Sequence, residues 1–128
     1  MSSQSYAAPL RAVDEVVVDP DGTSAAARKR VTRTDPYLAG HYPDFTIYPG
    51  VFMLESVVQT ARELVAARHY GARATLVGIR SLRFTAPLLD GDELAVALTL
   101  SADLVAKATC TRGDGKTAAT MTLEFRVD

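Results

Sequence analysis

The pattern of apolar positions predicts one long helix near the middle of the chain. In residues 50–68 (GVFMLESVVQTARELVAAR), apolar side chains recur at spacings of three and four, which is the period of an α-helix. The first three turns are apolar on nearly every side, and such a helix is buried in a core rather than laid on a surface. We therefore expect a central helix about 28 Å long, at a rise of ~1.5 Å per residue.

Period-two alternation and β-branched residues predict strands on both sides of this helix. The segments with this pattern are residues 10–18, 27–33, 74–84, 93–100, 105–111 and 117–127. The turn signal Asp21-Gly22 predicts that the first two form a hairpin, and the last four follow one another in hairpin succession. One antiparallel sheet wrapped around the helix satisfies this order and buries the helix on most sides. The sequence therefore predicts an α+β fold.

Length and composition are those of one small globular domain. The chain has 128 residues, of which 48% are hydrophobic and 23% charged, so we expect a single domain over residues 1–128 with residues 1–8 disordered. A net charge of −1 argues against a nucleic-acid partner, which requires a concentrated basic surface. No apolar run approaches the ~20 residues that cross a bilayer, so no membrane association is expected. The single Cys110 and the lack of a secretory signal favour a cytoplasmic protein.

One carboxylate interrupts the apolar helix. Glu55 lies inside the run VFMLESVV, and Gln59 follows one turn later on the same face, so the two form a short polar stripe. An isolated ionised carboxylate among apolar groups is costly, and the cost is relieved by a raised pKa or by a polar partner. A carboxyl group in such a place suits general acid catalysis. The alternative is that Glu55 points to solvent or to a hydrogen-bonded interface.

Two other chemical groups lie just before Glu55 in the sequence. His41 is in a loop stiffened by Pro43, and histidine is the commonest general base, although a lone loop histidine is more often a surface residue. Pro49 suits the first turn of a helix, and the N–H groups of Gly50 and Val51 at its positive end would bind an oxygen that gains negative charge. One segment therefore supplies a candidate base, a candidate acid and a candidate oxyanion donor.

The segment over residues 40–59 closely resembles the active-site segment of a known family. Its pattern, G-H-Y-P-x-x-x-x-x-P-G-V-x-x-x-E-x-x-x-Q, is similar to that of the hot-dog fold 3-hydroxyacyl-(acyl carrier protein) dehydratases of the FabZ type. The similarity extends upstream to DPYLAGHYP (35–43) and downstream to IRSLRFTAPLLDGDEL (79–94). The order of two strands, a central helix and four strands is that of the hot-dog fold, and it covers the whole chain.

The resemblance implies a reaction and a set of roles. The reaction is the removal of water from a 3-hydroxyacyl thioester to give the trans-2-enoyl thioester, with no metal and no cofactor. His41 and Glu55 match the catalytic pair, contributed by different subunits, while Gly50, followed by Val51, matches the residue that holds the thioester carbonyl. Gln59 is a supporting polar residue. The implied partners are acyl carrier protein with its acyl-phosphopantetheine and a second copy in a homodimer, or in a trimer of dimers.

Several alternatives stay open at this point. Tyr42, Phe45, Tyr48 and Pro49 either line the acyl tunnel or pack onto the core. The loop departs from the usual family pattern, so both fatty acid and polyketide-type biosynthesis are open. A hot-dog acyl thioesterase also uses a helix carboxylate but does not need the His-x-Pro loop. A non-catalytic hot-dog subunit that binds a partner or carrier protein generally loses the histidine or the carboxylate, and this chain keeps both.

Overall fold

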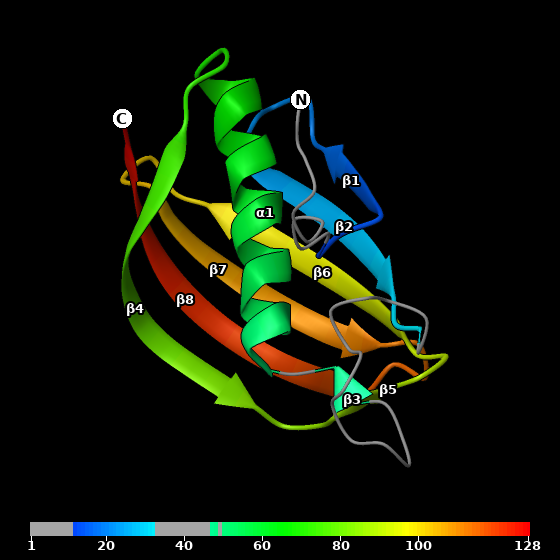
Figure 1. Ribbon diagram of the computed structural model, residues 1–128. Helices are drawn as coiled ribbons and strands as arrows, with labels where there is room; N and C mark the ends of the chain where they lie inside the picture. The colour runs from blue at the N-terminus through cyan, green and yellow to red at the C-terminus, as the bar shows by residue number, and fades with distance from the viewer. Residues whose placement is uncertain (1–11, 33–46, 49) are drawn as a thin grey trace, which may run out of the picture.

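A six-stranded antiparallel sheet curves around one long helix (Figure 1). The computed structural model describes residues 12–32, 47–48 and 50–128. Its elements are β1 (Glu15–Val18), β2 (Ser24–Arg30), β3 (Ile47–Tyr48), α1 (Gly50–Arg68), β4 (Ala74–Phe84), β5 (Leu88–Leu89), β6 (Glu93–Leu100), β7 (Val105–Arg112) and β8 (Thr117–Val127). The strand order is β1-β2-β6-β7-β8-β4, and β3 and β5 form a separate two-stranded sheet. The expected α+β class, with an antiparallel sheet wrapped around a central helix, is confirmed.

The helix lies in the concave face of the sheet, and its buried side forms the core (Figure 1). Its buried residues are Met53, Ser56, Val57, Val58, Thr60, Ala61, Leu64 and Val65. Every second residue of β6 and β7 is buried against it, as strand alternation requires. Cys110 is one of these inward residues, and burial raises the pKa of its thiol to about 12, so it is an inert core residue. None of the described helices is long and apolar enough to span a bilayer.

The predicted helix has the observed bounds, and the last four predicted strands are confirmed apart from one residue at the end of β7. The predicted strand over residues 27–33 is wrong at both ends, because β2 spans Ser24–Arg30. The turn explains the shift. Gly22 has φ +73° and donates to the Asp19 carbonyl at 2.9 Å, so the chain has already reversed when Ser24 begins its pairing with β6.

The first strand is also shorter than predicted. Over the described residues it begins at Glu15, and the chain just before it is held mainly by bonds that involve side chains, although the Asp14 N–H donates to the Arg28 carbonyl at 2.7 Å. The Ser56 hydroxyl donates to the Ala12 carbonyl at 2.6 Å, and the Asp14 carboxylate accepts from the Arg30 N–H at 2.7 Å. Residues 10–11 lie outside the described part, as do residues 1–8, for which disorder was expected.

The two-stranded sheet of β3 and β5 was not predicted. It pairs Ile47 with Leu89 and Tyr48 with Leu88, and strands of two residues carry too little alternation to be recognised. This pairing fixes the position of the chain just before the helix. The chain that enters the helix is tied to the turn before β6, where the Asp92 carboxylate accepts from the Leu89 N–H at 2.7 Å.

The C-terminal end of the helix is fastened to the sheet by Arg68. Its guanidinium donates to three backbone carbonyls, those of Gly22 (2.8 Å), Leu100 (2.7 Å) and Ser101 (2.8 Å). These carbonyls belong to the β1–β2 turn and to the end of β6, so one side chain joins the helix to two separate connections of the sheet. Gly71, at φ +78°, then ends the helix by donating to the Ala66 carbonyl.

We expect Arg68→Ala to lower the free energy of unfolding by about 2–3 kcal/mol, because it leaves three carbonyls without their charged donor. Arg68→Lys should recover only part of this, since an ammonium cannot reach all three. The measurement is urea unfolding followed by circular dichroism. Arg126→Ala is the matched control, because Arg126 makes an exposed pair with Asp128 at 3.1 Å that is worth less than about 1 kcal/mol. Equal losses for both alanine variants would contradict the role given to Arg68.

Candidate active site

A pocket of about 270 Å³ lies between the N-terminal half of α1 and β4. Its lining residues are Val51, Phe52, Leu54, Glu55, Val58, Arg62 and Leu76. Five of these side chains are apolar, and the other two carry opposite charges. A concave apolar site with few polar groups is the usual setting for a small-molecule ligand.

Glu55 is held in this pocket next to Arg62. The Glu55 Oε1 atom is 3.9 Å from Arg62 Nη1, and the glutamate side chain is 31% exposed. The cost of placing a carboxylate on an apolar helix is thus relieved by an oppositely charged partner and by partial access to solvent. Within the described residues, Arg62 is the only charged group in ion-pair contact with Glu55.

Gly50 opens the helix beside a phenylalanine ring. A Cβ atom at this position would lie 2.9–3.2 Å from three ring carbons of Phe84, so the ring would have to shift to admit it. Glycine therefore lets the ring of Phe84, near the end of β4, lie against the helix backbone. The first N–H groups of a helix have no acceptor within it, so those of Gly50 and the 63% exposed Val51 are suited to bind an oxygen.

Gln59 and Glu55 have different neighbours although they are one turn apart. The Gln59 Oε1 atom accepts from the Ala12 N–H at 3.2 Å, and Gln59 is not among the described residues that line the pocket. The short polar stripe is therefore divided. Glu55 is on the pocket side, and Gln59 binds the chain that leads into β1.

The remaining residues predicted for the site cannot be placed. His41, Tyr42, Phe45 and Pro49 lie outside the described residues, and only the backbone of Tyr48 is described, in β3. Their roles stay predictions.

Sequence reasoning missed six residues at the site. Phe84 contacts Gly50, and the other five line the pocket, namely Phe52, Leu54, Val58, Arg62 and Leu76. The sequence could have indicated Arg62, because this residue follows Glu55 by seven positions and so lies on the same helix face two turns later. Leu76 and Phe84 have no such signal, because only the folded sheet brings β4 to the helix.

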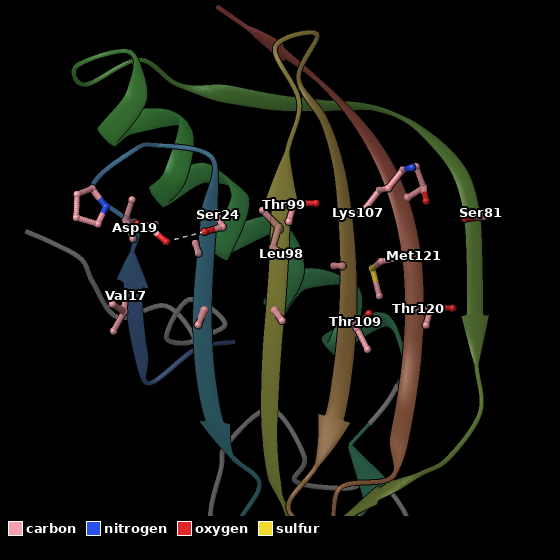
Figure 2. Close-up of a pocket in the computed structure, with 17 residues that line it drawn as sticks. Val17, Asp19, Ser24, Ser81, Leu98, Thr99, Lys107, Thr109, Thr120 and Met121 are labelled. Carbon is pink, nitrogen blue, oxygen red and sulfur yellow. Dashed lines mark hydrogen bonds between the residues drawn. The ribbon is translucent and has the colours of Figure 1, made fainter.

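A larger hollow of about 890 Å³ lies on the other face of the sheet, away from the helix (Figure 2). Outward residues of four strands form its floor, including Ala26, Ala97, Thr109 and Thr120. Figure 2 shows the Ser24 hydroxyl donating to the Asp19 carboxylate at its edge, at 3.1 Å. Its described lining holds no pair of groups suited to acid–base chemistry, so the pocket beside the helix is the better candidate site.

Comparison with known proteins gives consistent matches. Residues 17–122 match the family model ApeI-like (ApeI dehydratase). The chain is 32% identical over 126 residues to a 3-hydroxyacyl-[acyl-carrier-protein] dehydratase FabZ from Ruminiclostridium cellulolyticum, covering 91% of this chain and 86% of that protein. It is 35% identical over 94 residues to the FabZ of Polynucleobacter asymbioticus, and there the match covers 72% of this chain and 63% of the relative, just under two thirds of its length.

A solved structure shows the same fold. The dehydratase heterocomplex ApeI:P from Xenorhabdus doucetiae superimposes with a TM-score of 0.72 at 19% identity, covering 88% of this chain and 95% of that chain. At this identity the similarity establishes the hot-dog fold, which confirms the expected architecture.

The contact between Gly50 and Phe84 predicts an unusual response to a small substitution. Gly50→Ala should lower the free energy of unfolding by about 1–3 kcal/mol, because the new methyl group overpacks against the ring. Phe84→Leu in the same chain should recover most of the loss. Gly113→Ala is the control, since a Cβ there meets nothing closer than 3.9 Å. Chemical unfolding of the four proteins tests this, and a Gly50→Ala variant as stable as Gly113→Ala would contradict it.

Proposed function

Because the chain belongs to the ApeI-like dehydratase family, we propose that it removes water from 3-hydroxyacyl thioesters to give trans-2-enoyl thioesters. The substrate is carried on the phosphopantetheine arm of acyl carrier protein, in fatty acid or polyketide-type biosynthesis. The relatives named 3-hydroxyacyl-[acyl-carrier-protein] dehydratase support this substrate class.

The observation that carries the proposal is the position of Glu55. It is a carboxylate on an otherwise apolar stretch of helix, in a pocket with apolar walls, about one and a half turns from the free N–H groups at the helix start. A thioester carbonyl bound at Gly50 would place the acyl chain along the helix toward Glu55. Fixed donors at a helix start stabilise negative charge that develops on such an oxygen.

In the proposed mechanism the C2–H bond and the C3–O bond both break. His41 takes the C2 proton, and the electron pair forms the double bond between C2 and C3. Glu55 assists the departure of the 3-hydroxyl group by giving it a proton, so that the group leaves as water. The N–H of Gly50 polarises the carbonyl and stabilises the enolate-like charge that develops on it. The proton gained by His41 and the proton lost by Glu55 are exchanged before the next turnover, so the substrate loses one water molecule in all.

We further propose that the protein works as a homodimer. Among the described strands β4 is at the edge of the sheet and pairs with β8 alone, and it exposes four large apolar side chains, Val77, Ile79, Leu82 and Phe84. An edge strand with exposed apolar residues invites pairing with another chain. Because the pocket of Glu55 lies between α1 and this strand, a partner that pairs here would bring its own residues to the pocket, and the family resemblance makes its His41 the expected one.

Activity of the purified protein tests the reaction. Incubation with a 3-hydroxyacyl carrier-protein thioester should produce enoyl absorbance without release of free thiol. His41→Ala and Glu55→Gln should each reduce kcat about 10²–10⁴-fold, because each removes a proton-transfer group. Glu63→Gln, an exposed position on the same helix, is the control and should stay active. Free thiol would instead indicate a thioesterase, and no product at all would indicate a non-catalytic subunit.

The assembly is tested by a charge placed on the exposed edge. Ile79→Lys should shift the protein toward a monomer in sedimentation velocity and abolish dehydration, because a buried ammonium at the subunit contact is costly. Val17→Lys, which changes an exposed valine on β1 at the opposite edge of the sheet, should leave both properties unchanged. An Ile79→Lys monomer with wild-type activity would contradict a site shared between subunits.

A further inference from the structure

We propose that Arg62 is a positioning residue for Glu55, holding the carboxylate in the pocket through charge while leaving its oxygens free for the substrate hydroxyl. This inference rests on the proposed dehydration, since it assigns a partner to the group that acts on the 3-hydroxyl. It adds a residue to the site that the catalytic pair and the helix start do not include.

The position of the Arg62 side chain is fixed from a second element. Its Nε–H donates to the Ala74 carbonyl at 3.2 Å, so the guanidinium is tied to the first residue of β4. Side chains on a helix lean toward its N-terminus, which directs Arg62 back over the preceding turn toward Glu55. The charge beside Glu55 is thus held by the sheet as well as by the helix.

The distance between the two groups distinguishes this pair from the others. Arg28 and Glu93 are 2.8 Å apart, as are Arg112 and Asp114, and both are hydrogen-bonded pairs. At 3.9 Å, Arg62 and Glu55 form the longest of the described ion pairs, beyond the range of a charge-assisted hydrogen bond. The attraction therefore acts without a hydrogen bond to either carboxyl oxygen, and both oxygens stay free to contact the 3-hydroxyl group and to exchange a proton with it.

The walls of the pocket strengthen the interaction during the reaction. Val51, Leu54, Val58 and Leu76 surround the pair with apolar groups, and a lower dielectric increases the attraction between opposite charges. In the isolated chain the Arg62 side chain is 51% exposed, so solvent still screens it. A substrate and a second subunit over this pocket would exclude that solvent.

A simpler role for Arg62 is to tie the helix to β4 through the Ala74 carbonyl. The two roles differ in what they change. If Arg62 only joins the helix to β4, its loss lowers the free energy of unfolding whether or not Glu55 is present. If Arg62 positions Glu55, its loss lowers kcat and does so only when Glu55 is present.

The test compares steady-state kinetics of dehydration for four changes made in the wild type and in Glu55→Gln. Arg62→Gln should reduce kcat about five- to tenfold with KM changed less than twofold, because a single partly screened charge is lost. Arg62→Lys, which keeps the charge, should recover most of kcat. Arg62→Met keeps the apolar stem without the charge and should behave as Arg62→Gln does. Arg126→Gln, a remote exposed arginine of an ion pair, is the control and should not change kcat.

The double variant decides between the two roles. In the Glu55→Gln background, Arg62→Gln should cause no further loss of the residual rate. An equal loss in both backgrounds, or unchanged kcat in Arg62→Gln, would overturn the role, and thermal unfolding reports the folded fraction used to normalise each rate. An inactive wild type would overturn the proposed function together with this inference, whereas an active wild type unaffected by the Arg62 changes would overturn this inference alone.

Discussion

The enclosure of an almost wholly apolar helix is the constraint on which the structure depends. An α-helix with this composition has to be buried on most sides, and the curved sheet packs against it from β1 and β2 at one edge round to β4 at the other. Glu55 and Arg62 lie where the helix meets the edge strand β4, and solvent still reaches both side chains. The same constraint that builds the core therefore decides where a polar site can exist, because a carboxylate is tolerated only where the helix is incompletely covered.

Much of this fold could be predicted because its elements are long and regular. The helix and the strands after it each carry several periods of their pattern. The N-terminal hairpin was predicted with the correct turn, and β1 pairs with β2 as expected. Its second strand was predicted too late in the chain because the run Ala25–Ala27 has low β propensity, which pairing with β6 overrides. The two-residue strands β3 and β5 depend on contacts between distant segments, so no local pattern could predict them.

The residues of the candidate site could likewise be predicted only in part from the sequence. Glu55 could be recognised because a lone charge in an apolar helix is a local feature, and Gly50 because it marks the helix start. The roles of Arg62 and Phe84 could not be recognised because they depend on contacts between β4 and the helix. These contacts form only when the sheet folds around the helix. The residues before the helix, including His41, are known here from the sequence alone, so the pairing of His41 with Glu55 is an inference from the family resemblance and the exposed edge of β4.

The reverse reaction in heavy water tests the central claim most directly, since it reports the hydrogen transfer itself. With a trans-2-enoyl carrier-protein thioester in D₂O, Glu55 acts as the base that activates water for attack on C3, and protonated His41 delivers one deuteron to C2 of the 3-hydroxyacyl product. Mass spectrometry and proton NMR of that product should show a single deuteron with one configuration at C2, and Glu55→Gln should suppress its formation. A free acid without deuterium, or deuterated product formed equally well by Glu55→Gln, would contradict the account.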